Sequence, residues 1–529
     1  MTTAAVRTAK GLFTNFNGYH EVPEGALLEA ENIVIQKPGT ISPRRGLGRY
    51  GNAINFSSVF EFRDRIVGLS GSSLVYDSTE TGVWVSYGGS YDPPDATSRL
   101  LGLQVDLSLL LNTAKGIYVT DALTRDPVRA GMPPGLDTQL ALVGTGLGWF
   151  TPGTKVGYRI FWGRVDQNGR EKVGAPSMRE ALVSPKTSVT MTATTTTVTV
   201  THTAHGYSTG DTITVSNLSD AKYQPNSTIT LVDANSYTYT TASAPPATGT
   251  MDVGKKFNVT LTFTVPKDVA AGDFYEVYRT DLSSDGAIDA GDIQKRLFRV
   301  TVTATDITNR DTAVGVPVTL TDTLEPAFLG EQAYTNNSRE GIEKANSRPP
   351  WAKYMATFRN FTFYGNLKRE QLVELQLQDI AGLTDNTSYV RFVIGGTTLT
   401  YTFSTADDIA NRKFKRVTTE STQAANVRET AKNLCKVINR DNSQTLIYAY
   451  YVSGILDPPG TIVIEARSPD TVAFTVLADS ATTGGKFSPA LPTSGTLYQS
   501  DNGTELNGLG YSKQLIPEAV PDANTVEIG

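Results

Sequence analysis

The sequence predicts an all-β protein with a β-propeller-like platform that carries inserted β domains. Three observations lead to this fold class. Thr, Val and Tyr, which favour pleated strands, dominate long stretches of the 529 residues, together with Gly. Short segments of alternating apolar and polar residues recur along the chain and are separated by Gly-, Asn- and Asp-containing turns. Only one segment, 422–439, has the spacing of an amphipathic helix.

The composition is that of an ordinary folded protein. Apolar residues make up 39% of the chain and charged residues 19%, and a length of 529 residues predicts about three domains. No apolar run approaches the ~18 residues that a membrane span needs, and the N-terminus lacks the apolar core of a secretory signal. We therefore expect a protein without a membrane span that is made in a cytoplasm.

Several chemistries are disfavoured by the residue inventory. The single cysteine, Cys435, leaves no internal disulfide and no Cys-based zinc site. A net charge of −6 argues against a protein that reads nucleic-acid sequence, although it suits a wall past which DNA slides. The chain has three histidines and none of the common nucleophile-elbow, zinc-protease or phosphate-loop motifs. We therefore predict that the protein is not an enzyme and has no cofactor, a structural calcium excepted.

Residues 1–149 are predicted to hold an N-terminal segment and the first blades of the platform. Between residues 59 and 87, four short strands alternate with tight polar turns, and the last strand contains Trp84. Four short strands per repeat are typical of a propeller blade. A related pattern assigns residues 331–370 to another blade. Residues 499–529 are assigned to a return to the platform, with truncation at the C-terminus as an open alternative.

The middle of the chain is predicted to fold as an immunoglobulin-like or fibronectin-like sandwich over residues 150–330. Alternation is strict near residue 260, where Leu261, Phe263 and Val265 fall on one face of a strand. Further sandwich strands are expected at 156–162, 274–280 and 297–303. Residues 186–255 interrupt the sandwich and are predicted to form a small inserted β domain that is rich in Thr.

A second inserted β domain is predicted over residues 371–498, and it carries the one expected helix. The apolar residues of this helix recur at helical spacing and should form its buried face: Ala424, Val427, Ala431, Leu434 and Ile438.

The sharpest local motif is an acidic loop at 281–292. Its residues match the ligand spacing of a calcium loop, with Asp281, Ser283 and Asp285 at positions 1, 3 and 5, Gly286 at the turn, the carbonyl of Ala287 at 7, Asp289 at 9 and Asp292 at 12. Clustered oxygen ligands suit a hard cation, and without one the carboxylates would repel each other. The motif therefore predicts a structural calcium site, with a solvated acidic hairpin loop as the alternative.

An ordered set of motifs resembles the tail nozzle or tail hub proteins of short-tailed bacteriophages. Each motif alone is weak, but together they span most of the chain. They lie at 11–15, 21–27, 32–35 and 38–46; at 158–159 and 174–177; at 334–336, 341–342 and 346–350; and at 511–513 and 517–521.

The resemblance implies a virion protein of the phage tail. Such proteins assemble as rings, usually hexamers, below the portal and the adaptor. There they continue the DNA channel, hold packaged DNA in, and dock tail fibres or spikes. An alternative is a receptor-binding tail component that recognises host surface glycans, for which tyrosines of the Thr-rich insert could stack on sugars. Cross-strand packing is the competing interpretation of these tyrosines, which are Tyr207, Tyr223, Tyr237 and Tyr239.

Overall fold

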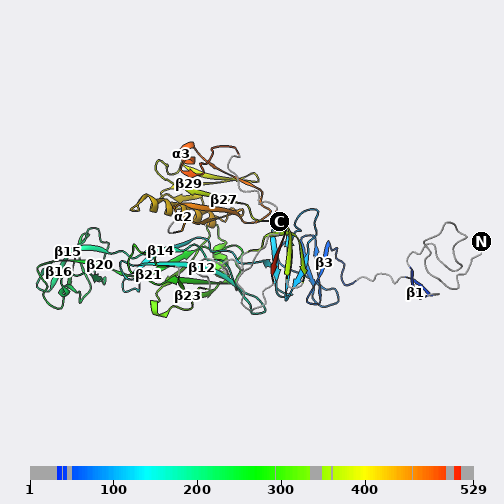
Figure 1. Cartoon of the computed structure of the whole chain (residues 1–529), viewed down its shortest axis with the longest axis horizontal. Coiled ribbons are helices and arrows are strands. Elements are labelled where there is room, and N and C mark those ends of the chain that lie inside the picture. Colours follow the sequence, from blue (N-terminus) through cyan, green and yellow to red (C-terminus); the bar gives the residue numbers. More distant parts are fainter. Residues whose placement is uncertain are drawn as a thin grey trace, which may run out of the picture. The chain divides into compact units, whose positions relative to one another are not determined.

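The computed structural model describes residues 33–37, 40–43, 50–291, 293–333, 348–358, 361–454, 457–495 and 506–513. It confirms the all-β class, because strands in small, almost entirely antiparallel sheets far outnumber helices in this part of the chain (Figure 1). Three α-helices occur in it: α1 (Ala304–Arg310), α2 (Gln423–Arg440) and α3 (Ala481–Gly484). The expectation of one helix in the second insert was therefore wrong, because α2 and α3 both lie there.

The chain divides into a small unit, Met1–Asn55 with Asp77–Val85, and a large unit that holds the rest. The small unit contains an antiparallel hairpin of β1 (Ile33–Lys37) and β2 (Thr40–Pro43). Its second segment contains most of β6 (Trp84–Ser86). The large unit contains the other sheets.

Three antiparallel sheets of the large unit, which we call the meander sheets, pair their strands in the order in which these occur along the chain, although residues 369–505 separate the last two strands of the third sheet. Their strands are β3 (Ser58–Phe62), β4 (Arg65–Ser70) and β5 (Ser73–Asp77); β7 (Gly102–Val105), β8 (Ser108–Thr113), β9 (Gly116–Thr120) and β10 (Val128–Arg129); and β25 (Trp351–Phe358), β26 (Phe361–Lys368) and β35 (Leu506–Lys513). One apolar core, with Phe62 and Leu109, joins the first sheet to the second. Another, with Ile117 and Met355, joins the second to the third. The first and second sheets therefore share one apolar core, and the second and third share another.

Two further sheets enclose a single core and form the sandwich. One holds β11 (Thr138–Gly146), β21 (Lys256–Phe263) and β24 (Val318–Asp322), and the other holds β12 (Lys155–Val165), β13 (Glu171–Val173), β14 (Glu180–Val183), β22 (Phe274–Thr280) and β23 (Gln294–Thr301). The alternation predicted near residue 260 is confirmed, because Leu261, Phe263 and Val265 are buried together with Ile160 and Trp162.

Residues 187–254 form a six-stranded sheet with a core of its own, and we call this segment the Thr-rich body. Its strands are β15 (Thr187–Thr194), β16 (Thr197–Thr201), β17 (Thr214–Ser216), β18 (Thr230–Asp233), β19 (Ser236–Thr240) and β20 (Thr248–Gly254). Alternation decides which side chains are buried: Val198 and Val200 enter the core from β16, whereas Thr197 and Thr201 are exposed.

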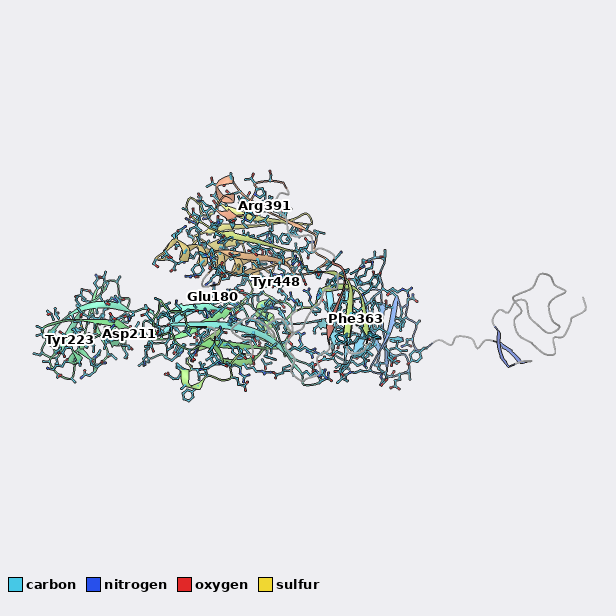
Figure 2. All side chains as sticks on the ribbon, viewed as in Figure 1. Glu180, Asp211, Tyr223, Phe363, Arg391 and Tyr448 are labelled. Atoms are coloured by element: carbon cyan, nitrogen blue, oxygen red, sulfur yellow. The ribbon has the colours of Figure 1, made fainter. Side chains whose placement is uncertain are left out.

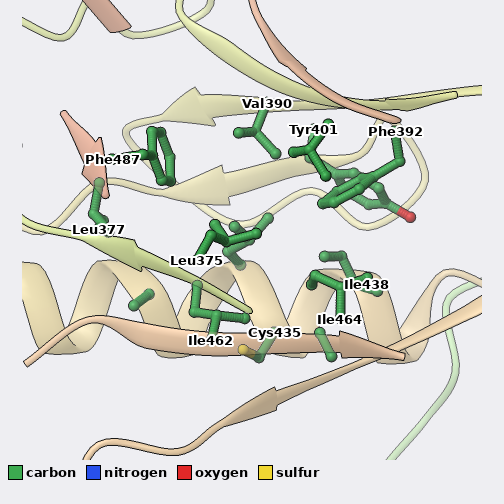
Figure 3. Packing of buried hydrophobic residues seen from close by; sticks show 14 of the residues in the cluster. Leu375, Leu377, Val390, Phe392, Tyr401, Cys435, Ile438, Ile462, Ile464 and Phe487 are labelled. Carbon is green, nitrogen blue, oxygen red and sulfur yellow. The ribbon is translucent and has the colours of Figure 1, made fainter. Parts of the chain in front are cut away.

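Residues 371–495, which we call the helical body, contain two four-stranded sheets and helix α2. One sheet holds β27 (Leu372–Leu377), β31 (Ile447–Tyr451), β32 (Thr461–Ala466) and β34 (Phe487–Ser488), and the other holds β28 (Tyr389–Ile394), β29 (Thr397–Ser404), β30 (Lys413–Lys415) and β33 (Phe474–Ala478). Side chains such as Leu375, Val390 and Ile438 point into one shared core (Figure 3).

Helix α2 matches its prediction to within one residue at each end. It begins after Thr422, whose Oγ1 accepts a hydrogen bond from the N–H of Ala425 at 3.2 Å and thereby caps the helix. Four of the five expected apolar residues are buried. Ala424 is exposed, because it lies in the first turn, before the helix contacts the sheets.

Candidate functional site

The predicted calcium loop connects β22 to β23 in the sandwich, and Asp292 lies outside the described residues. Ser283 and Asp285 are brought together: the buried Ser283 Oγ donates to the Asp285 carbonyl at 2.7 Å and accepts from the Lys155 N–H at 2.8 Å. Asp285 Oδ1 accepts from the Ala287 N–H at 2.9 Å. These bonds build a tight turn that is tied to β12.

The outer carboxylates of the loop are paired with cations of the chain. The Asp281 oxygens lie 2.9 and 3.0 Å from Lys295 Nζ, and Asp289 Oδ2 lies 2.7 Å from Arg179 Nη2. Gly286 is outside the left-handed region that the sixth position of such a loop uses. The apolar Ile288 is 53% exposed and therefore anchors nothing.

The described part of this loop thus disperses its charges onto neighbouring cations. No group of three or more His, Cys, Asp or Glu side chains that could hold a metal occurs among the residues described. Calcium binding through Asp281, Ser283, Asp285, Ala287 and Asp292 stays a prediction, and a metal would have to displace the Lys295 and Arg179 contacts.

A second group of charged residues, which the sequence analysis missed, follows one face of α2. Basic side chains recur every four residues, which places them close together on a helix surface: Arg428, Lys432, Lys436 and Arg440. Two of them contact acidic side chains of the sandwich. Lys432 Nζ lies 2.5 Å from Glu180 Oε2, and Arg440 Nη2 lies 3.1 Å from Asp137 Oδ2. We call this contact the seam, and Glu180 is labelled in Figure 2.

Both ion pairs of the seam are shielded from water. The side chains of Lys432 and Glu180 are 15% and 13% exposed, and those of Arg440 and Asp137 are also largely buried. Burial opposes the charge of Lys432, but the adjacent Glu180 carboxylate outweighs it and raises the pKa of the ammonium. Burial also raises the pKa of the Glu180 carboxyl, because desolvation outweighs the attraction of Lys432.

The seam opens at one end into a cleft of about 410 Å³. Its lining is charged on both sides, with Lys155, Arg179 and Glu180 from the sandwich and Arg428, Glu429 and Lys432 from α2. The cations are largely matched by acids, since Arg179 pairs with Asp289 and Arg428 with Glu429. The arrangement suits contact between two parts of a protein better than capture of a strongly charged ligand.

A third charged cluster lies where the chain enters the helical body. Arg129 of β10 pairs with Glu370, and Arg348 pairs with Asp268 of the sandwich. Burial and the neighbouring Glu370 carboxylate raise the pKa of Glu465 on β32 to about 7. Perturbed carboxyls are frequent at active sites. Here the cluster's described contacts are ion pairs between segments, which indicates a structural role.

The tyrosines of the Thr-rich body are mostly internal. Tyr223, Tyr237 and Tyr239 are at most 2% exposed; Tyr237 and Tyr239 pack within the sheet from β19, whereas Tyr223 enters the same core from a 3-10 turn (Figure 2 labels Tyr223). Tyr207 is partly exposed, but Lys255 Nζ lies 4.8 Å from its ring centroid and the His202 ring 5.4 Å from it. The Tyr207 ring is therefore already surrounded by side chains, and little of these four tyrosine rings is accessible for stacking on a sugar.

Of the motifs that suggested a phage tail protein, those at 158–159 and 174–177 lie in described residues and contribute to the sandwich. The Tyr158 hydroxyl donates to Asp322 Oδ2 at 2.7 Å, and Ser177 Oγ accepts from the Ile160 N–H at 3.0 Å. Most residues of the motifs at 11–46, 334–350 and 511–521 lie outside the described side chains.

Neither a protein-family model nor a curated protein matches this chain. Within the part of the chain that the structure describes, no helix is both long and apolar enough to cross a membrane.

Proposed function

We propose that this chain is a structural virion protein, a subunit of the tail nozzle or tail hub ring of a short-tailed bacteriophage, and not an enzyme. The observation that carries the proposal is the set of three meander sheets that share apolar cores in succession. Small antiparallel sheets packed face to face in succession are what a propeller-like platform would require, and this supports the proposal.

The order of the segments along the chain supports the same proposal. In sequence, the sandwich lies between the second and third meander sheets, and the Thr-rich body is inserted between its strands β14 and β21. The helical body separates β26 from β35 within the third sheet. Large insertions in the loops of a rigid platform are tolerated when they leave the host core intact. In a tail ring, such bodies would reach fibres, spikes or the adaptor.

The proposed ring would be a homo-oligomer, with six subunits as the resemblance implies, closed by one repeated interface. A heterologous interface that closes gives a channel, whereas one that does not close gives a fibre. A net charge of −6 suits a wall past which DNA moves, because it does not attract phosphate. The ring would continue the channel below the portal and adaptor and retain packaged DNA in the virion.

Electron microscopy of virions labelled with an antibody against this chain tests the proposal. We expect label on the tail axis at the distal tip, with rings in averaged images. Particles assembled without the protein should lose their DNA or have a shortened tail. Label on peripheral appendages would favour the receptor-binding alternative, and absence from purified virions would overturn both.

A further inference from the structure

The helical body has a hydrophobic core that belongs to it alone. All 27 buried residues of this core fall between Val373 and Leu491. None of the five apolar clusters found among the described residues combines side chains of the helical body with those of the sandwich or the meander sheets. Since each body buries its own apolar residues, the contact between them is not needed to complete either core.

The described hydrogen bonds and ion pairs between the helical body and the sandwich use charged and polar groups. Besides the pairs Lys432–Glu180 and Arg440–Asp137, Arg440 Nε donates to Thr264 Oγ1 at 3.0 Å. At the far end, the Tyr448 hydroxyl accepts a hydrogen bond from the backbone N–H of Lys267 at 3.0 Å (Figure 2 labels Tyr448).

The sequences of α2 and β31 explain how each of these elements contributes both to the core of the helical body and to its contact with the sandwich. In α2, Val427, Ala431, Leu434 and Ile438 face the body's own core, and the basic residues at four-residue spacing occupy another face. In β31, Ile447 and Ala449 point into the core, while Tyr448 between them points away from it. Outward residues of both elements reach the sandwich, and so does Asn442 between them, whose Nδ2 donates to the carbonyls of Arg310 and Thr312.

An interface of this composition orients two bodies but holds them weakly. Taking two charges out of water offsets most of their attraction, so a buried ion pair adds little net stability compared with apolar packing. Polar interfaces between domains of one chain resemble transient protein–protein contacts, for which relative motion is the usual behaviour.

The chain also provides a short connection on which the helical body could turn. β26 ends at Lys368 and β27 begins at Leu372, so three residues join the third meander sheet to the helical body. One of them, Glu370, pairs with Arg129 of β10, which also donates to the carbonyl of Arg467 in the helical body at 2.9 Å.

We propose that the helical body is a docked arm, which the ion pairs of the seam hold on the sandwich and which swings away as a folded unit. In the docked state Lys432 and Arg440 contact Glu180 and Asp137. In the open state these four charged groups are exposed to water and available to partners, while the core of the helical body stays intact. This conformational device does not depend on the function proposed above.

Charge reversal in the full-length protein tests this inference, with hydrogen exchange as the readout. Lys432→Glu and Glu180→Lys should each speed exchange in β14 (Glu180–Val183) by about tenfold or more, because each places like charges together in a buried contact. Exchange in β28, inside the helical body, should not change. The control is Arg428→Glu, which lies on the same helix face but pairs only with its neighbour Glu429 in the described structure.

Two further variants separate docking from folding. The double reversal Lys432→Glu with Glu180→Lys should restore slow exchange in β14, whereas Lys432→Met, which leaves Glu180 buried without a partner, should open the seam as the single reversals do. Unchanged exchange of β14 in all single variants would overturn the proposal. So would faster exchange in β28 to the same extent as in β14, because docking and folding would then be one event.

Discussion

Arg279 and Asp322 form an ion pair in which both side chains are completely buried, with Nη1 and Oδ2 2.5 Å apart. Arg279 comes from β22 and Asp322 ends β24, so the pair joins the two sheets of the sandwich. Tyr158 donates to the same carboxylate oxygen, and the Arg279 guanidinium lies 3.7 Å from the centroid of the Trp149 ring. Polar groups therefore specify how the two sheets face each other.

Removing one member of this pair should destabilise the sandwich strongly. We expect Asp322→Ala to lower the free energy of unfolding by about 3–5 kcal/mol, because Arg279 would remain as a buried charge without an anionic partner. Denaturant unfolding of the full-length protein measures the change. The matched control is Asp281→Ala, whose exposed pair with Lys295 should contribute less than about 1 kcal/mol. Similar losses in the two variants would contradict the assigned role.

Acid should destabilise the Thr-rich body through His202. Burial, and to a smaller extent His205, lower the pKa of His202, and its Nδ1 is buried without a hydrogen-bond partner in the described structure. Tyr207 and Tyr237 complete its surroundings. The unfolded chain therefore binds a proton more readily than the folded one. Stability is full above the ordinary histidine pKa of about 6.5 and is lost as the pH falls through the lower folded value.

Hydrogen exchange of β16 and β19 between pH 7.5 and 5 measures this effect, after correction for the intrinsic rates. His202→Gln should flatten the dependence, since no imidazole remains to be protonated in the core. His205 is the control residue, because both its ring nitrogens already have partners, the Asp233 carbonyl and the Tyr207 N–H. An equal acid response in wild type and His202→Gln would rule out His202 as the sensor.

Raising the pH should destabilise the charged cluster around Glu465, which is the opposite direction to the effect of pH on His202. Burial first, and then Glu370, raise the pKa of Glu465 to about 7, above the ordinary value of about 4.3. Asp268 adds to this effect, whereas Arg348 and Arg129 oppose it. Here the folded chain binds the proton more readily. The contribution to stability is full below the ordinary carboxyl pKa and is lost as the pH rises through about 7.

Glu465→Gln imitates the protonated carboxyl at every pH. The variant should be more stable than wild type at pH 8, by about 2 kcal/mol, and the difference should shrink towards pH 5. Melting temperatures across this range measure the effect. Glu374→Gln, on the neighbouring strand β27 and exposed, is the control and should change little. A variant that is less stable than wild type at pH 8 would show that the ionised carboxylate is favourable here.

Local sequence patterns predicted the helices and strands of this protein well, but they did not predict the contacts between distant segments. The spacing of Val427, Ala431, Leu434 and Ile438 is contained within one helix, and it located α2 to within one residue at each end. Helix α3 has four residues, which is about one turn, and so shows no periodicity that a sequence could reveal.

The seam could not be predicted, because its partners lie far apart in sequence. Lys432 and Glu180 are separated by 252 residues, and Arg440 and Asp137 by 303. The basic spacing in α2 was visible in the sequence, but a row of cations on a helix is more often a solvated face. For the acidic loop, spacing alone could not show that Arg179, 110 residues before Asp289, supplies a competing charge.

Melting temperatures can show whether the 281–292 loop binds calcium or is a hairpin held only by its salt bridges. A ligand that binds only the folded state stabilises it, by about 2.7 kcal/mol at a free concentration one hundred times its dissociation constant. Calcium added after chelation should therefore raise the melting temperature if Asp281, Ser283, Asp285 and Asp292 converge on the ion. Asp285→Ala should abolish the shift, since this variant removes the central ligand.

Replacing a basic side chain that pairs with the loop distinguishes the two arrangements. Lys295→Met removes the partner of Asp281, so the loop carboxylates would repel each other more strongly without metal. In a calcium loop this change should enlarge the stabilisation by calcium, because the ion no longer competes with an ammonium group. In a salt-bridged hairpin, calcium should stabilise neither wild type nor Lys295→Met, and the loop would then be purely a connection between β22 and β23.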